Sequence, residues 1–324
     1  MREADIDVNS LTTYYGQFNQ NLWAAVAKKS SVMRFLKYLD KFRREGVLTA
    51  ELLREKINVT VLKKAKVFPF RLYTAFRAIG NGTTSGRATA QVNPPIPSLL
   101  CSALNALESD SANTPSPTTT TTMHTATIRR HLEMTLNDYA ATYDWSAFAP
   151  FRWVIAPDIS GSMTSPIGGS SSLSYSSVSA MFCGFFIKGI PDVRVLPWTT
   201  QVHMYTVSAD APVMEHIRAI EQMVGGGTSM ESAVKHMLEQ KIKTDFAVFL
   251  TDTEEYGRGW LHWWQIYHRF CPAAVAFILR GDSYTTAPIS DKTAAELNVY
   301  QVFGWNDSVI DYIKFIVAER KGLL

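Results

Sequence analysis

From residue 152 onward the chain alternates short apolar, β-rich runs with longer helical stretches. The strand candidates are 152–156, 193–198, 246–252, 273–279 and 298–304, and the helix candidates are 175–189, 213–224, 229–240, 260–270 and 306–320. Because the strand candidates are apolar at almost every position, both faces of their sheet must be covered, as in a parallel sheet flanked by helices. The pattern predicts a doubly wound α/β domain over residues 151–324.

The first 90 residues have a different texture. Apolar residues at helical spacing predict helices over 31–42, 50–67 and 69–79. Gly46 is expected to end the first of them, and Thr49 is placed to cap the second. None of these short helices can bury its apolar face alone, so residues 1–90 are interpreted as α-helical repeats of the HEAT type.

Two segments connect these regions. Residues 91–124 are rich in Pro, Thr and Ser, which is typical of an insertion or linker, with one short helix at most, at 98–108. Apolar positions at helical spacing predict a further helix over 125–143, within a linking segment 125–150.

The net charge of +3 is unevenly distributed. Residues 28–77 hold 14 Lys or Arg against 4 Asp or Glu, whereas residues 151–324 hold 14 against 17. A basic helical part suggests an anionic partner at that part of the chain, and the alternative is a solvated basic face with no partner.

Cysteine usage and apolar runs limit the cellular setting. Cys101, Cys183 and Cys271 are far apart and form no CxxC pair, which fits a reducing compartment rather than a disulfide framework or a zinc site. The polar N-terminal residues do not resemble a signal peptide, and the longest apolar run, about ten residues at 178–187, is half of what a membrane span needs. We expect a soluble, cytoplasmic protein with no membrane partner.

Three polar clusters follow elements of the predicted sheet. They lie at 158–162 after the first strand, at 225–228 between two helices and at 251–252 after the third strand. Ligands of such sheets bind at the carboxyl ends of the strands. Carboxylate and hydroxyl oxygens are hard ligands that suit Mg²⁺, or a similar cation such as Mn²⁺ or Ca²⁺. The expected metal ligands are Asp158, Ser160, Ser162, Thr228 and Asp252, and the alternative is three unrelated polar loops.

These clusters resemble a known site. DISGSM, GGGTSM and FLTDTE, in this order, resemble the metal-ion-dependent adhesion site (MIDAS) of von Willebrand factor A domains. In addition, FLKYLDKF and VLKKAKVFPFRLYTAFRAIGNG look like the last helical repeats of the TROVE module, and TDTEEY and FGWNDSVIDYIKFIV look like the Ro autoantigen family. That family joins a TROVE ring of helical repeats to an A domain. The resemblance covers nearly the whole chain except residues 81–122.

The resemblance implies a function. Ro proteins bind small structured RNAs and the single-stranded ends of misfolded RNAs, and their basic helices touch the RNA. About 90 residues match only the C-terminal part of the TROVE module, which would make this chain a short member whose single copy could not close the ring. The candidate RNA-binding residues are Lys28, Lys29, Arg34, Lys37, Lys41, Arg43, Arg44, Lys63, Lys64, Lys66, Arg71 and Arg77.

Several residues have a plainer interpretation beside the functional one. Phe68, Phe70 and Tyr73 could stack on bases, but their helical spacing favours the core. His262 and His268 flank two tryptophans and are interpreted as packing residues, and Glu254 and Glu255 as loop carboxylates.

The sequence carries no enzyme signature that we recognise. HExxH, Walker A and GxGxxG motifs are absent, and GxSxG fails around Ser160 because position 158 is Asp. We therefore expect a non-enzymatic RNA-binding component of a ribonucleoprotein. The alternative is a metal-dependent protein-interaction or structural module, in which the A domain binds an acidic partner residue.

The truncated helical part also suggests self-association. Helical repeats hide their end faces with neighbouring repeats or caps. The residues nearest the open end are Leu22, Trp23, Val26, Val32 and Phe35. If they are exposed, they predict a homo-oligomer through the helical region. The alternative is that the 125–143 helix or the acidic segment 91–150, which holds 2 Lys or Arg against 5 Asp or Glu, covers this end within one chain.

Overall fold

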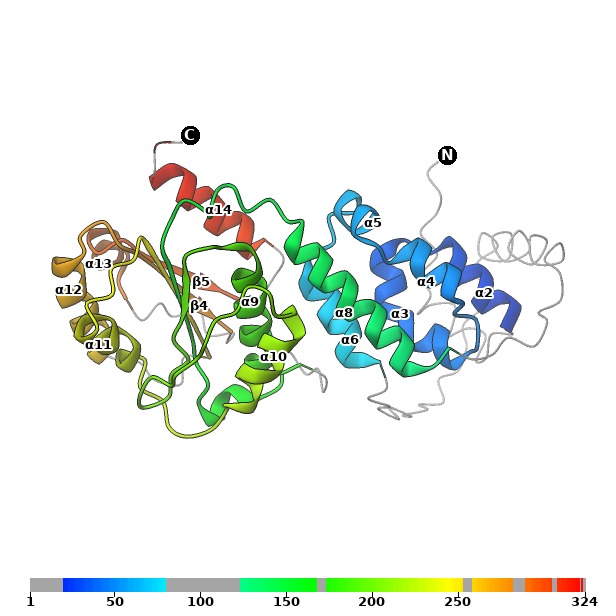
Figure 1. Cartoon of the computed structure of the whole chain (residues 1–324), viewed down its shortest axis with the longest axis horizontal. Coiled ribbons are helices and arrows are strands. Elements are labelled where there is room, and N and C mark those ends of the chain that lie inside the picture. The colour runs from blue at the N-terminus through cyan, green and yellow to red at the C-terminus, as the bar shows by residue number, and fades with distance from the viewer. Residues whose placement is uncertain are drawn as a thin grey trace, which may run out of the picture. The chain divides into compact units, whose positions relative to one another are not determined.

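The computed structural model describes residues 20–79, 123–167, 173–252, 258–281, 289–304, 308–320 and 322 (Figure 1). They form two compact units: residues 20–67, 75–79 and 123–132 make the first, and residues 68–74 together with those from 133 onward make the second. The expectations for Cys101, the 98–108 helix, Glu254 and Glu255 and most of the 91–124 insertion lie outside the described residues. In the ranges given, no helix has the length and apolarity required to cross a membrane.

The first unit is helical, as the sequence predicts. It contains α2 (Gln20–Lys29), α3 (Val32–Arg44), α4 (Ala50–Lys56) and α5 (Val59–Lys64), and its boundary with the second unit falls within α6 (Pro69–Ala78) and α8 (Thr125–Ala141). The Thr49 side chain accepts a hydrogen bond from the Leu52 N–H at 3.2 Å and caps α4. Gly46, at φ 69°, ends α3 in the left-handed conformation.

One predicted helix is wrong in its length. The sequence favours one helix over 50–67, but the structure breaks it between α4 and α5. Asn58 causes the break, because its side-chain N–H groups donate to the carbonyls of Arg54 and Glu55, while its Oδ1 accepts from the Val61 N–H at 3.0 Å. One amide thus ends α4 and caps α5.

Four of the five apolar residues expected at the open end of the helical unit are buried, and Val32 is half-buried. Trp23 is 3% exposed and Phe35 is completely buried, and Leu22 and Val26 are buried as well. Trp23 packs edge-on against Phe42, with ring centroids 6.1 Å apart. The expected homo-oligomer therefore lacks the exposed apolar face that motivated it. The first half of the linking helix α8 packs within this unit, where His131 Nε2 lies 2.7 Å from the Ile57 carbonyl oxygen.

The second unit is built on a five-stranded parallel sheet, which confirms the predicted fold class. Its strands are β1 (Trp153–Pro157), β2 (Val193–Val195), β3 (Phe246–Thr251), β4 (Val275–Arg280) and β5 (Val299–Phe303), in the order β2-β1-β3-β4-β5. Each corresponds to one of the five strand candidates. Every residue of β1, β3 and β4 is buried, as apolar strands covered on both faces require.

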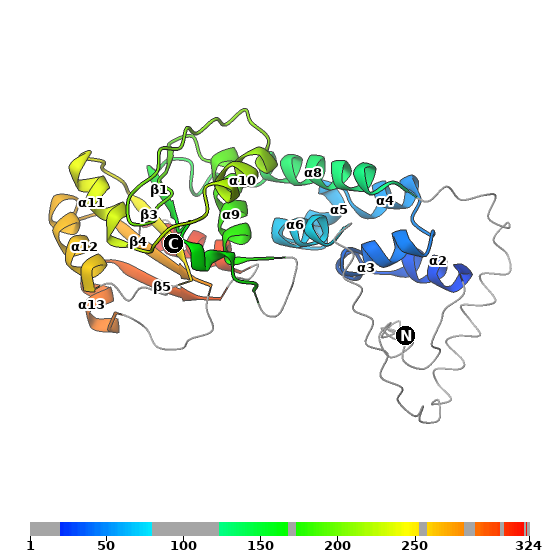
Figure 2. The ribbon, with the colours of Figure 1, turned by 90° about the horizontal axis from the view of Figure 1, so that it is seen from below.

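Helices cover both faces of this sheet (Figures 1 and 2). One face packs against α9 (Tyr175–Gly189), α10 (Val213–Gln222) and α14 (Val309–Arg320), and the other against α11 (Glu231–Glu239), α12 (Arg258–Phe270) and α13 (Asp291–Glu296). Alternate residues of β1 divide between them: Val154 joins the core beneath α11 and α12, and Trp153 contacts Phe186 of α9. The sequence analysis did not predict α13.

The last residue of α9 is a glycine because an indole lies against it. A Cβ at Gly189 would lie 1.9 Å from the ring of Trp145, which is itself fixed by a 2.8 Å hydrogen bond from its Nε1 to the Ala140 carbonyl. We expect Gly189→Ala to lower the free energy of unfolding by roughly 2 kcal/mol or more, since overpacking outweighs the better helix propensity of alanine. Urea denaturation measures this. Gly161→Ala, whose Cβ would make only an ordinary 3.5 Å contact, is the control, and equal effects of the two changes would contradict the packing argument.

Candidate functional site

The strand order creates a switch point between β1 and β3. From β1 the chain goes to β2 on one side, and it returns to place β3 on the other side of β1. In open α/β sheets, ligands bind outside the carboxyl ends of the strands at such a point. Asp158 follows β1 and Asp252 follows β3, and the Asp158 N–H donates to the Leu250 carbonyl at 2.8 Å. Two of the predicted ligands therefore come from neighbouring strands at this edge.

The carboxylate of Asp158 is buried and held by hydrogen bonds. Its Oδ1 accepts from the Ser160 N–H and its Oδ2 from the Thr251 hydroxyl, each at 2.8 Å. The Ser160 Oγ lies 3.2 Å from the Ser162 Oγ. The three polar residues of the DxSxS motif are thus close together on the loop after β1.

The electrostatics of this site favour a bound cation. The pKa of Asp158 is raised to about 6, chiefly by burial and to a smaller extent by the charge of Asp252, against the hydrogen bonds from Ser160 and Thr251 that lower it. Asp252 is itself buried. Two buried carboxylates of like charge are costly unless a positive charge offsets them, and the surrounding oxygen donors suit a hard divalent ion.

The donor set depends on hydroxyl groups. Within the described part of the chain, no three His, Cys, Asp or Glu side chains group together in a way that could hold a metal. The candidate centre has two carboxylates, so Ser160, Ser162 and Thr228 would have to supply further oxygens. This composition differs from a zinc site, which prefers nitrogen and sulfur ligands.

The glycine-rich loop is fastened to the DxSxS loop. The Gly225 N–H donates to the Ile159 carbonyl at 2.8 Å, and the Gly161 N–H donates to the Gly226 carbonyl at 3.1 Å. Gly226 has a φ of 89°, which residues with a side chain rarely adopt. This pairing brings the backbone that carries the half-buried Thr228 to the loop of Ser160 and Ser162.

The segment after β2 supports both loops, although no motif in the sequence marks it. The Ile159 N–H donates to the Trp198 carbonyl at 3.0 Å, and the Thr199 carbonyl accepts from the Ser229 N–H at 3.1 Å. The Trp198 indole is fully buried and donates to the Ala156 carbonyl. In the sequence Trp198 was only the last apolar residue of a strand candidate, so nothing marked it as a support of the site.

A second unpredicted residue lies at the same edge. Arg280 is fully buried at the carboxyl end of β4, and in the β3–β4 register it pairs with Thr251. Its guanidinium lies 4.9 Å from the centroid of the Phe303 ring. A fully buried arginine is unusual, and this one lies on β4, the neighbour of the strand that Asp252 follows. The one sequence signal was an Arg at the end of an otherwise apolar run.

The candidate RNA-binding residues differ in their surroundings. Arg43 and Arg44 form ion pairs with Asp40, and Lys41 pairs with Glu45 at 2.6 Å, so α3 is partly neutralised. Arg71 belongs to the second unit, and the other eleven belong to the first. The residues that are both exposed and outside these ion pairs are Lys28, Lys29, Lys37, Lys63, Lys64, Lys66 and Arg71.

Two of the three aromatic candidates for base stacking, Tyr73 and Phe68, are packing residues, in agreement with their spacing. Tyr73 is completely buried and its hydroxyl donates to Glu221 Oε1 at 3.1 Å. Phe68 is half-buried against Phe185, with ring centroids 5.6 Å apart. His268 is half-buried, with its Nε2 3.2 Å from Asn298 Nδ2, whereas His262 is exposed, so the packing interpretation holds for His268 and is wrong for His262.

Comparisons with known proteins agree with this architecture. A family model described as the Ro60 vWA domain matches residues 152–263. The crystal structure of the Ro (RSR) protein of Deinococcus radiodurans matches the chain with a TM-score of 0.63 and 14% sequence identity, over 91% of this chain and 54% of that one. The chain thus spans about half the length of the Deinococcus protein, and the likeness shows a shared fold. A comparison with curated protein sequences finds no match.

Proposed function

We propose that the chain is a Ro-type protein and a component of a cytoplasmic ribonucleoprotein, since a Ro60 vWA family model matches residues 152–263 and the fold resembles that of the Deinococcus Ro (RSR) protein. In this proposal the basic helices of the first unit bind small structured or misfolded RNA. The observation that carries it is the gathering of exposed lysines at two helix ends: Lys28 and Lys29 end α2, and Lys63, Lys64 and Lys66 lie at the end of α5. Lysine contacts of this kind bind phosphates with little sequence preference.

The backbone at Lys66 supports a role for its side chain. Lys66 follows α5 at a φ of 53°, and the Val67 N–H beyond it donates to the Leu62 carbonyl at 2.9 Å. This is the helix-ending motif in which glycine is the favoured residue. A lysine there costs about 1 kcal/mol relative to glycine, and the comparable motif after α3 has Gly46. A strained position that holds a cation favours a functional explanation.

The proposal includes a divalent cation, preferably Mg²⁺, held by Asp158, Ser160, Ser162, Thr228 and Asp252. The ion would supply a positive charge that offsets the two buried carboxylates. It would also tie together three loops that the sheet brings to one edge. The proposal assigns no catalytic step to the chain.

A second candidate function is a metal-dependent protein-interaction module. One observation favours it, since the ion pairs of Asp40 and Glu45 neutralise part of the basic surface of α3. In that case the metal would accept an acidic residue of a partner protein, and RNA would play no part.

Sequencing of the nucleic acid that copurifies with the full chain tests the proposal. We expect small structured RNAs to be enriched over the total RNA of the source cell, and to be lost when the protein is washed at high salt. A preparation that carries no RNA at low salt, together with capture of an acidic protein that EDTA releases, would favour the interaction module instead.

A further inference from the structure

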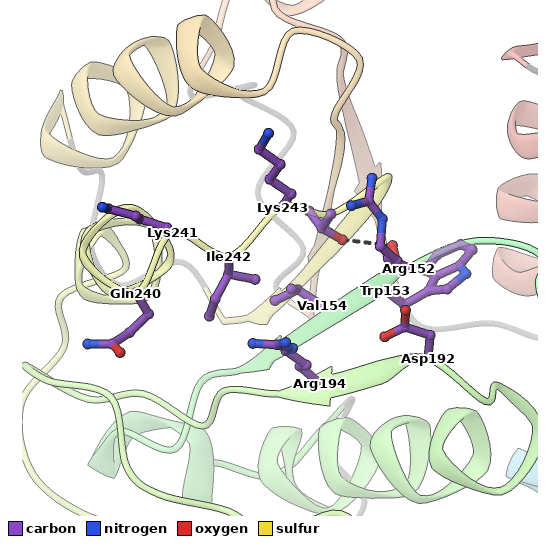
Figure 3. Close-up of a pocket in the computed structure, with 10 residues that line it drawn as sticks. Arg152, Trp153, Val154, Asp192, Arg194, Gln240, Lys241, Ile242 and Lys243 are labelled. Carbon is purple, nitrogen blue, oxygen red and sulfur yellow. Dashed lines mark hydrogen bonds between the residues drawn. The ribbon is translucent and has the colours of Figure 1, made fainter.

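A recess of about 290 Å³ opens at the amino edge of the sheet, at the opposite ends of the strands from the candidate metal centre (Figure 3). It lies entirely in the second unit. Four cationic side chains line it, against the single carboxylate of Asp192. They are Arg152, Arg194, Lys241 and Lys243.

The cations come from three separate chain segments that the sheet brings together. Arg152 precedes β1, Arg194 is the exposed middle residue of β2, and Lys243 precedes β3. Parallel strands are about 4.8 Å apart, so the step from β2 across β1 to β3 covers about 10 Å. Figure 3 shows Val154 and Ile242 in the middle, with Arg194 on one side and Lys243 on the other.

One of the cations is held in place. The Arg152 Nε and Nη2 donate to the two carboxylate oxygens of Asp245 at 3.2 and 3.3 Å. A guanidinium has five N–H donors, and these bonds use two of them. Asp245 therefore fixes the orientation of the group without using its whole capacity to bind an anion.

Lys241 occupies a strained backbone position, as Lys66 does in the first unit. It follows α11 at a φ of 51°, and the Ile242 N–H donates to the Met237 carbonyl at 2.8 Å. Glycine would adopt this conformation without strain. The presence of lysine in place of glycine favours a functional role for its charge in the recess.

The lining favours phosphates over bases. Trp153 is the aromatic residue of the lining, but it is 1% exposed and its Nε1 donates to the Phe148 carbonyl at 3.0 Å, so its ring offers no surface for stacking. The exposed groups of the lining are the four cations together with Asp192 and Gln240, so positive charge predominates along the strand ends. Such a surface contacts a sugar–phosphate backbone and carries no base preference.

We propose that this recess binds the phosphates of an RNA backbone and gives the A domain its own RNA contact, separate from the basic helices. The inference rests on the proposed RNA-binding function. It adds Arg152, Arg194, Lys241 and Lys243 to the surface that touches RNA, although the charge pattern of the sequence pointed to residues 28–77 alone.

The test compares two double variants of the full chain by fluorescence anisotropy with a labelled single-stranded oligouridylate at several salt concentrations. Arg194→Gln with Lys241→Gln removes two cations from the recess. The control variant, Lys292→Gln with Arg320→Gln, also removes one exposed Lys and one exposed Arg, from α13 and α14. These residues lie away from the recess, since Arg320 contacts Tyr300 of β5, the edge strand on the opposite side of the sheet from β2. We expect the recess variant to bind roughly tenfold more weakly at low salt, with the slope of log K against log salt reduced by about 1.4, and the control to bind like the wild type.

Each other outcome is decisive. If the wild type binds RNA and the recess variant binds equally well, the recess is not an RNA contact and the proposed function stands on the helices. If the wild type binds no RNA at low salt, the proposed function fails together with the inference. A parallel titration with inorganic phosphate distinguishes an RNA contact from a site for a small anion. If the recess binds phosphate saturably, the recess variant loses that binding, and no RNA binds there, the recess is a small-anion site and the RNA assignment is overturned.

Discussion

Replacing Asp158 with alanine is expected to abolish Mg²⁺ and Mn²⁺ binding while the chain stays folded. Asp158 lies on a loop beyond β1, and its carboxylate is one of the two that would neutralise the ion. Its loss removes the hydrogen-bond acceptor of the Ser160 N–H and the Thr251 hydroxyl, but it also relieves the repulsion with Asp252. These effects on the metal-free protein oppose each other, so the large change is in metal affinity.

Two measurements report the loss of metal binding in Asp158→Ala. Calorimetric titration gives the metal affinity, and thermal unfolding with and without Mg²⁺ gives the linked stability, which reaches about 2.7 kcal/mol at a metal concentration 100 times Kd. We expect that stabilisation in the wild type and not in Asp158→Ala, and a weaker one in Asp252→Ala. Asp210→Ala, which removes an exposed loop carboxylate, is the control. Unchanged metal affinity in Asp158→Ala would rule out the assignment.

The second large effect concerns RNA. Changing Lys63, Lys64 and Lys66 together to glutamate is expected to weaken RNA binding by roughly 100-fold or more at low salt, because three attractive phosphate contacts become repulsive. All three side chains are exposed, so the fold should tolerate the change. Filter binding with several unrelated RNAs should show the same loss for each sequence. Equal affinities of the triple variant and the wild type would remove α5 from the RNA surface.

A single change separates charge from stability at this site. Lys66→Gly removes one cation and also relieves the left-handed backbone, so we expect the free energy of unfolding to rise by about 1 kcal/mol while RNA affinity falls. A loss of affinity in a more stable protein cannot come from unfolding. If Lys66→Gly is stabilised and binds RNA as the wild type does, the side chain has no contact with RNA.

The architecture of the A domain could be predicted from the sequence because the spacing of apolar residues indicates which side chains are buried. Strands such as β3, buried at every position, are apolar at every position, and the amphipathic helices between them show their core faces. The helix α13 was missed because six residues are too short for a periodic signal. The break at Asn58 was missed because the side-chain bonds that cause it leave the apolar spacing unchanged.

The candidate metal centre was accessible to sequence reasoning for a local reason. Asp158 and Asp252 each follow an apolar strand directly, and the carboxyl ends of parallel strands share one edge of a sheet. The support that Trp198 and Thr199 give to those loops could not be predicted, because their hydrogen bonds join segments that are distant in the sequence. The basic recess was hidden for the same reason, since the overall charge of residues 151–324 is slightly acidic and its cations lie up to 91 positions apart.

The expected exposed end face failed for a different reason. The apolar residues of α2 and α3 were assigned to a surface on the expectation that no neighbouring repeat covers them. In the structure Trp23, Phe35 and Phe42 pack with one another, so the helical unit forms a core of its own. Apolar spacing shows which face of a helix is buried, and it does not show which neighbour buries it.

The affinity of the full chain for RNA as a function of salt shows whether its basic side chains bind RNA phosphates. The probe is a labelled small RNA with a duplex stem and a single-stranded tail, titrated by fluorescence anisotropy in Mg²⁺-containing buffer after nuclease treatment of the protein. We expect binding at low salt and a linear fall of log K with log salt, with a slope of about −4 for five or six phosphate contacts. Absence of binding at the lowest salt concentration, or an affinity that does not change with salt, would contradict this expectation.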